Sequence, residues 1–155
     1  MEKTNVMRLL DAAAIPYEAH AYDAEVTDGE QVAALVGKDA DSVFKTLVTI
    51  GASGAHYVFV VPVNCTLDLK KAARAAKEKS IRMIPQKDLL PLTGYVHGGC
   101  SPIGMKKQFP TFLNDTAELF DAICFSAGKR GMQVELSPVA LSEYVKAPFI
   151  DLTEQ

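Results

Sequence analysis

The sequence lacks any hydrophobic run approaching the ~20 residues that a membrane-spanning helix needs. Residues 1–20 contain acidic side chains and lack the apolar core of a cleavable signal peptide. The cysteines, Cys65, Cys100 and Cys124, are far apart and form no CxxC pair, which argues against a disulfide framework and a zinc knuckle. The glycine patterns of dinucleotide-binding folds and of P-loops are also missing. We therefore expect a cytoplasmic protein without those cofactor sites.

The length of the chain fits one domain. It has 155 residues and a mass of 16.8 kDa, and domains of roughly 100–200 residues are typical. Folding at this size removes roughly two-thirds of the surface from water, which is enough for a core without covalent staples. Hydrophobic residues make up 48% and charged residues 23%, a globular rather than a disordered composition. We expect a single domain over residues 1–155.

The net charge of −3 conceals an uneven distribution. Residues 66–130 carry eleven Lys or Arg and six Asp or Glu, whereas acidic residues outnumber basic ones on either side of this segment. A basic segment between acidic flanks is compatible with a phosphate-binding surface. Solvated lysines scattered over the surface would give the same count. Charge alone therefore leaves a nucleic-acid partner open.

Hydrophobic periodicity predicts helices that alternate with short strands. Helices are expected at residues 4–14, from the capping-box spacing of Thr27–Glu30 to Gly37, at 68–78, at 85–90, and from Ser137-Pro138 to about 146. Strands are expected at 17–22, 43–50, 57–63, 81–84, 94–97, 110–113, 122–126 and 132–136, with turns at 51–54 and 128–131. Short turns between successive strands favour an α+β domain with a mixed, mostly antiparallel sheet of about seven strands flanked by helices.

The segment GGCSPIG at 98–104 has three glycines and one proline in seven residues, which excludes a regular helix or strand. Glycine permits positive φ and lets the backbone approach a ligand closely. Successive N–H groups in such a loop can bind an oxyanion, a carboxylate or a phosphate. Lys106 and Lys107 follow the loop, where an anionic substrate would be favoured. A tight bend between two strands would explain the same glycines equally well.

A lysine interrupts the apolar strand VFKTLV at 43–48. Strand alternation places Lys45 on one face with Val43 and Leu47. Its long apolar stem can lie along that face while the ammonium reaches solvent. Alternatively, the ammonium points into a pocket and pairs with a phosphate or a developing negative charge.

The sequence offers no standard nucleophile. Ser101 is not in a GxSxG elbow. Cys100 could be paired with His20 or His97, but an unpaired intracellular cysteine is more often a small buried hydrophobe. His97 and Cys100 are also too few to define a metal site. The residues alone indicate a single domain with a glycine loop, a strand lysine and a basic middle segment.

Four ordered segments resemble one known family. They are VFKTLV at 43–48, LDLKK at 67–71, GYVHGGCSPIGMKK at 94–107 and SAGKRG at 126–131. Their order and spacing are similar to those of YbaK-type editing domains, which occur inserted in many bacterial prolyl-tRNA synthetases and as free-standing trans-editing proteins. The resemblance covers nearly the whole chain and is strongest to the free-standing Cys-tRNA(Pro) deacylases. It implies a single α+β domain with a mixed, barrel-like sheet flanked by helices.

The resemblance implies a deacylase that clears mischarged tRNA(Pro), because a synthetase pocket cannot strongly reject amino acids close to proline in size. Cys-tRNA(Pro) is the expected substrate and Cys-tRNA(Cys) a further candidate. In Cys-specific members the thiol of the substrate is thought to attack its own ester, so no metal or organic cofactor is expected. The partners implied are tRNA and also prolyl-tRNA synthetase, rather than DNA or a membrane, and no oligomeric state is favoured.

The resemblance also assigns residues. Lys45 would lie beside the 3′ end of the substrate, Tyr22 is associated with activity, and the loop would shape the amino-acid pocket. The expected catalytic set is Lys45, Tyr22, Gly98, Gly99, Ser101, Pro102 and Gly104. The expected tRNA-binding set is Lys70, Lys71, Arg74, Lys106, Lys107, Lys129 and Arg130. Two alternatives remain open: an Ala-tRNA(Pro) deacylase that uses water, and a non-catalytic module that binds tRNA or a synthetase.

Overall fold

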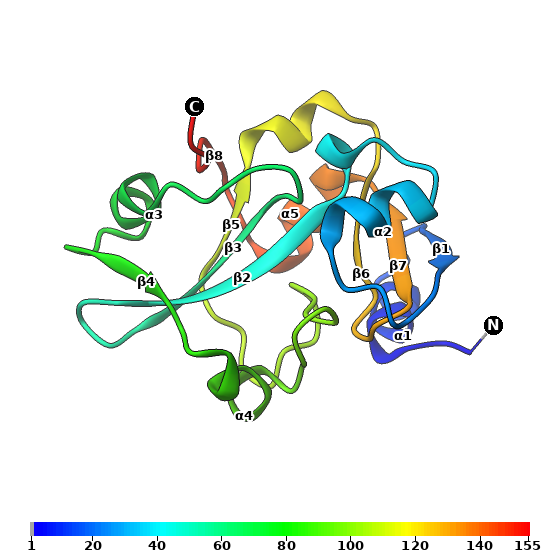
Figure 1. Cartoon of the computed structure of the whole chain (residues 1–155), viewed down its shortest axis with the longest axis horizontal. Coiled ribbons are helices and arrows are strands. Elements are labelled where there is room, and N and C mark those ends of the chain that lie inside the picture. Colours follow the sequence, from blue (N-terminus) through cyan, green and yellow to red (C-terminus); the bar gives the residue numbers. More distant parts are fainter. Residues whose placement is uncertain (1) are drawn as a thin grey trace.

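The computed structural model describes residues 2–155 and shows two β-sheets with helices packed around them (Figure 1). The helices are α1 (Asn5–Ala12), α2 (Gly29–Leu35), α3 (Leu69–Ala76), α4 (Leu89–Thr93) and α5 (Pro138–Val145). The strands are β1 (Glu18–Ala21), β2 (Phe44–Gly51), β3 (His56–Pro62), β4 (Ile81–Met83), β5 (Thr111–Asn114), β6 (Ile123–Ser126), β7 (Met132–Leu136) and β8 (Phe149–Ile150). Short 3-10 turns cover Ala40–Ser42, Gln86–Asp88 and Asp115–Leu119.

The sheets are mixed and mostly antiparallel, which confirms the predicted α+β class. One has the strand order β1-β7-β6 and the other the order β4-β2-β3-β5-β8. Among the named strands of residues 2–155, β3 with β5 and β5 with β8 pair in parallel, and the other pairs are antiparallel. A parallel bridge between Val43 and Cys124 joins the start of β2 to β6, so the two ladders meet without forming one closed barrel.

Side-chain caps begin four of the helices, and the first is Thr4, which accepts a hydrogen bond from the Met7 amide at the start of α1. Asp68 accepts hydrogen bonds from two amides at the start of α3, and Ser137 caps α5 ahead of Pro138. The second helix also begins in the predicted Thr27–Glu30 segment. Its N-cap is Asp28, which accepts from the Gln31 amide, one residue later than the capping-box spacing places it.

The predicted strand at 94–97 is wrong. Gly94 ends α4 with a φ of +86°, and the chain then enters a loop. The predicted helix at 85–90 is divided into a 3-10 turn and α4, which continues to Thr93. Pro91 is tolerated there because it lies in the first turn, where its missing N–H has no helical acceptor. Strand β8 was not predicted, since a two-residue strand leaves no periodic pattern.

The apolar residues form two principal cores. The larger one packs α1 and α5 against β2, β6 and β7, and it includes Leu10, Phe44 and Phe125. The smaller one lies between α3 and β3, around Phe59 and Ala72. Among residues 2–155, no helix has the length and apolarity that crossing a membrane requires.

Candidate functional site

A cavity of about 490 Å³ lies where α2, β2, α4 and the glycine loop meet. This volume is in the range of small-molecule sites. Three residues expected in the catalytic set line it, namely Tyr22, Lys45 and Gly98. Tyr22 follows β1 and is held by a hydrogen bond from its amide to the Gly131 carbonyl, 2.9 Å. Segments far apart in the sequence thus build one site.

Lys45 reaches the cavity from the second position of β2. Its neighbours in the strand fix its direction, because Phe44 is buried in the larger core. Lys45 itself is half-buried and lines the cavity. Within the described part of the chain, none of the four ion pairs includes it. Its ammonium is therefore available to an anionic group of a ligand.

The glycine-rich segment forms a loop whose ends are tied together. The Lys106 amide donates to the Thr93 carbonyl at 3.0 Å. The Tyr95 hydroxyl donates across the loop to the Ile103 carbonyl, and burial raises the pKa of this phenol to about 12, which preserves the donor. Ser101 is completely buried, and its hydroxyl accepts a hydrogen bond from the Ile103 amide at 3.4 Å. These contacts give the loop one defined shape.

The loop also packs against the turn at 128–131. A Cβ added at Gly99 would lie 3.1 Å from the Lys129 Cα and the Arg130 amide nitrogen. The Arg130 Nε donates to the His97 carbonyl at 2.8 Å. These contacts place Lys129 and Arg130 next to the loop that lines the cavity. Both side chains are exposed. A phosphate at this rim would face positive charge.

The two loop residues that line the cavity have backbone amides without an acceptor in the described part of the chain. Gly98 and Cys100 line the cavity, and among residues 2–155 neither of their amides donates a hydrogen bond. The intervening Gly99 amide is engaged, because it donates to the Val96 carbonyl at 2.9 Å. Two residues of the cavity lining thus carry unpaired N–H groups, and unpaired backbone N–H groups are the kind that can bind a developing oxyanion.

Cys100 is poorly suited to nucleophilic attack. Burial raises the pKa of its thiol to about 12, so the neutral form dominates near pH 7. Only the thiolate is an effective nucleophile, and reactive cysteines have a lowered pKa. Cys100 therefore acts as an apolar wall of the cavity.

Gly104→Ala is expected to destabilise the protein more than Gly54→Ala. The φ angles are +83° and +90°, so alanine costs about 1–2 kcal/mol at either position. At Gly104 alone, the added Cβ would lie 2.8 Å from the Tyr95 hydroxyl oxygen, whereas nothing lies within 4 Å at Gly54. The extra loss should be about 1–3 kcal/mol in the free energy of unfolding, measured with urea. Equal losses would show that the loop moves to accommodate the methyl group.

The remaining residues of the expected catalytic and tRNA-binding sets do not line the cavity. Gly99, Ser101, Pro102 and Gly104 do not line the cavity but shape the loop that does. Among the expected tRNA-binding residues, Lys106 reaches the Pro91 carbonyl at 3.4 Å and Lys107 lies over the Phe109 ring.

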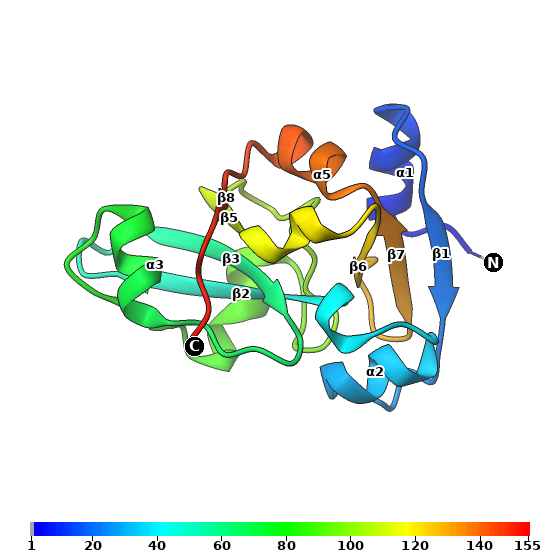
Figure 2. The ribbon, with the colours of Figure 1, turned by 90° about the horizontal axis from the view of Figure 1, so that it is seen from above.

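The basic residues of α3 lie apart from the cavity. Figures 1 and 2 place α3 at the opposite end of the molecule from α2, which borders the cavity. Lys71 donates to Asp151 at 2.9 Å and to the Thr153 carbonyl at 2.7 Å, so it holds the C-terminal segment. Lys70 and Arg74 are exposed on the same helix. A tRNA end in the cavity would reach Lys129 and Arg130 sooner than these residues.

Among the cavity residues to which the sequence gave no site role are two polar strand residues, Thr46 and Gln133. Each stands in a strand whose alternating pattern gave it no distinct role. Gln133 is only 6% exposed. Glutamine side chains are mostly exposed, so this burial distinguishes the residue, but burial is known only from the structure.

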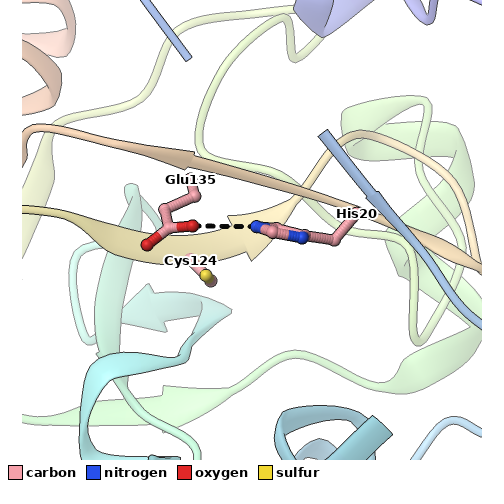
Figure 3. A group of neighbouring side chains, drawn as sticks. All are labelled: His20, Cys124 and Glu135. Atoms are coloured by element: carbon pink, nitrogen blue, oxygen red, sulfur yellow. Dashed lines mark hydrogen bonds and ion pairs between the residues drawn. The ribbon is translucent and has the colours of Figure 1, made fainter. Parts of the chain in front are cut away.

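Two residues after Gln133, and so on the same face of β7, Glu135 belongs to a polar cluster. Figure 3 shows it with His20 and Cys124. His20 Nε2 lies 2.8 Å from Glu135 Oε1, and Lys38 Nζ lies 3.0 Å from Glu135 Oε2. Burial alone would raise the pKa of Glu135, but the hydrogen bonds to His20 and Lys38 outweigh it and lower that pKa.

Ligand atoms of His20, Cys124 and Glu135 lie within 4.8 Å of one another, a spacing that metal sites also show. The Lys38 ammonium, however, occupies the second carboxylate oxygen and would repel a cation. Burial raises the pKa of Cys124 to about 12, which keeps the thiol protonated. The cluster therefore joins strands β1, β6 and β7 as an ion-paired network.

A family model and two curated relatives match this sequence. The family model "Aminoacyl-tRNA editing domain" matches residues 23–144. An Enterococcus faecalis protein named "Putative Cys-tRNA(Pro)/Cys-tRNA(Cys) deacylase EbsC" is 46% identical over 154 residues, which cover 98% of this chain and 94% of that protein. "Uncharacterized protein YwhH" of Bacillus subtilis is 27% identical over 115 residues, covering 74% and 73% of the two chains.

Solved structures share the fold. A crystal structure described as "a putative trans-editing enzyme for prolyl tRNA synthetase" superimposes with a TM-score of 0.86 at 23% identity, over 100% of both chains. The crystal structure of "hypothetical protein APE2540" gives a TM-score of 0.90 at 21% identity, over 97% of this chain and 100% of that one. At these identities the similarity establishes the architecture and nothing finer.

Proposed function

This chain belongs to the aminoacyl-tRNA editing domain family, and from this premise we propose that it is a deacylase that cleaves Cys-tRNA(Pro). The observation that carries the proposal is one cavity that Lys45 lines together with Gly98 and Cys100, whose amides have no acceptor among residues 2–155 and whose one thiol stays protonated. Such a site suits a substrate that brings its own nucleophile. Cys-tRNA(Cys) has the same aminoacyl end and is a second substrate, as in the name of the relative EbsC.

In the proposed reaction, the sulfur of the substrate cysteine attacks the carbonyl carbon of its own ester. A C–S bond forms, the bond to the 3′ oxygen of the tRNA breaks, and the thiol proton passes to that oxygen. The products are the tRNA and a cyclic thiolactone. Holding the reactive conformer can contribute about 7–11 kcal/mol in favourable intramolecular cases.

The residues of the cavity have distinct tasks in this scheme. The Gly98 and Cys100 amides donate to the carbonyl oxygen as it becomes an oxyanion, where one such donor is worth about 3–4 kcal/mol. Lys45 pairs with the terminal phosphate or ribose and fixes the ester beside these amides. Tyr22 closes the cavity on the side of β1. The remaining loop residues, Gly99, Ser101, Pro102 and Gly104, hold the amides in place.

Two other functions remain as alternatives, and one experiment separates all three. Purified protein is incubated with Cys-, Ala- and Pro-tRNA(Pro), and the remaining aminoacyl-tRNA is followed over time. We expect rapid loss of the cysteinyl ester alone. Preferential loss of the alanyl ester would instead establish an Ala-tRNA(Pro) deacylase that uses water. Tight binding without cleavage of any substrate would establish a non-catalytic module.

Lys129→Gln is expected to weaken tRNA binding and its salt dependence. Lys129 is exposed in the turn beside the cavity loop, where a phosphate of the acceptor end would lie. Each phosphate contact contributes about 0.7–0.9 to the slope of log affinity against log salt concentration. The slope should fall by about that amount in binding titrations at several salt concentrations.

Lys70→Gln is the matched control, because Lys70 is an exposed lysine on α3 at the far end. Its slope change should be smaller than that of Lys129→Gln. Equal changes would mean that the tRNA does not enter from the side of the 128–131 turn. Lys106, Lys107 and Arg130 are proposed as secondary contacts to the acceptor stem, whereas Lys71 and Arg74, on α3 like Lys70, would meet only parts of the tRNA farther from its aminoacyl end.

The proposed substrate also defines where the protein works. Mischarged tRNA(Pro) is produced by prolyl-tRNA synthetase, so we place the protein in the cytoplasm beside that enzyme. A transient complex with the synthetase would pass the tRNA from one site to the other before it is released.

A further inference from the structure

Two polar atoms in the cavity wall have no partner. Among residues 2–155, only Thr46 Oγ1 and Gln133 Oε1 are buried side-chain N or O atoms without a hydrogen bond. Both residues line the same cavity, although they come from different sheets. Leaving a buried polar group unpaired destabilises a protein, and native structures contain few of them. Their coincidence in one cavity points to a ligand that completes them.

The chemistry of the cavity wall defines that ligand. The free amides of Gly98 and Cys100 donate, whereas an amide oxygen accepts and a hydroxyl can do either. The cavity thus has donors from the loop and acceptors from β2 and β7. An α-amino ester is complementary to this arrangement, since it has an accepting carbonyl on one carbon and a donating ammonium on the next.

We propose that Thr46 and Gln133 form the subsite for the α-amino group of the aminoacyl ester. The Gln133 carboxamide and the Thr46 hydroxyl accept hydrogen bonds from the ammonium, while the loop amides hold the carbonyl oxygen. Fixing both groups sets the rotation about the bond between the α-carbon and the carbonyl carbon. This inference rests on the proposed deacylase function, and it makes the two residues positioning groups that select α-amino acyl esters.

The test removes the hydrogen bond from either side. Gln133→Leu and Thr46→Val keep approximate size and lose the acceptor, and 3-mercaptopropionyl-tRNA(Pro) is the substrate that lacks the α-amino group. On Cys-tRNA(Pro), each variant should lose about 10- to 100-fold in kcat/KM, because a hydrogen bond to a charged group is removed. On the desamino substrate, wild type and variants should agree within about 3-fold. Thr46→Ser, which keeps the hydroxyl, should restore most of the activity on Cys-tRNA(Pro) that Thr46→Val loses.

The pattern of losses decides the inference. If a variant loses the same factor on both substrates, its residue does not bind the amino group and the inference is overturned. Circular dichroism identifies a misfolded variant, and the other position then carries the test. The wild-type rate on Cys-tRNA(Pro) separately reports the proposed function. If that rate is negligible, the same comparison is made with Ala-tRNA(Pro) and propionyl-tRNA(Pro), where the expected ratios are unchanged.

Discussion

Lys45→Ala should lower kcat/KM for Cys-tRNA(Pro) by about 10²–10³-fold while the protein stays folded. A loss of about this size is typical when one group that stabilises developing charge is removed from an active site. Lys45 lines the cavity, and no ion pair in the described chain engages it, so no structural partner is lost with the ammonium. Single-turnover deacylation gives the rate, and thermal unfolding reports the fold.

Lys45→Arg is the more demanding variant. A compact ammonium and a planar guanidinium differ in shape and in hydrogen-bond geometry, so we expect this variant to be impaired as well. Lys70→Ala serves as control, because it removes an exposed lysine far from the cavity and should leave the rate unchanged. Wild-type turnover by a folded Lys45→Ala protein would exclude the residue from the reaction.

Much of the fold follows from local patterns in the sequence. The hairpin of β2 and β3 was predictable because two β-rich runs flank a glycine turn, and the caps Asp68 and Ser137 mark their helices. The strand predicted after Gly94 was wrong for a physical reason. Its aromatic and β-branched residues have strand propensity, but Tyr95 uses its hydroxyl to close the loop, so its role is set by a tertiary contact.

The candidate site likewise contains residues that local patterns predict and residues that depend on tertiary contacts. Lys45 and the glycine loop were predictable, because a charge in an apolar strand and a dense glycine segment both break local rules. Thr46 and Gln133 broke no such rule, since polar residues normally alternate along a half-exposed strand. Their significance comes from burial against segments distant in the sequence. Pairing of this kind depends on the assembled fold and not on any one segment.

Methylating the substrate sulfur should nearly abolish cleavage. S-methylcysteinyl-tRNA(Pro) keeps the amino group and the ester of the substrate and adds one methyl group, but its thioether cannot form a thiolate and attack the ester. Seryl-tRNA(Pro) should react far more slowly than the cysteinyl ester, because a hydroxyl is a poorer nucleophile than a thiol. Deacylation rates of the three esters, measured with the same wild-type protein, give this comparison directly.

Cys100→Ala tests the same mechanism from the side of the protein. Burial keeps the Cys100 thiol protonated, with its pKa raised to about 12, so the variant should retain substantial activity. Ser101→Ala should lose only the equivalent of about 0.5–1.5 kcal/mol, since the hydroxyl contacts the loop backbone and not the cavity. Two results would contradict substrate-assisted cleavage. One is an inactive Cys100→Ala protein that still folds and binds tRNA, and the other is rapid release of free S-methylcysteine. Either result would favour attack by an enzyme nucleophile or by activated water.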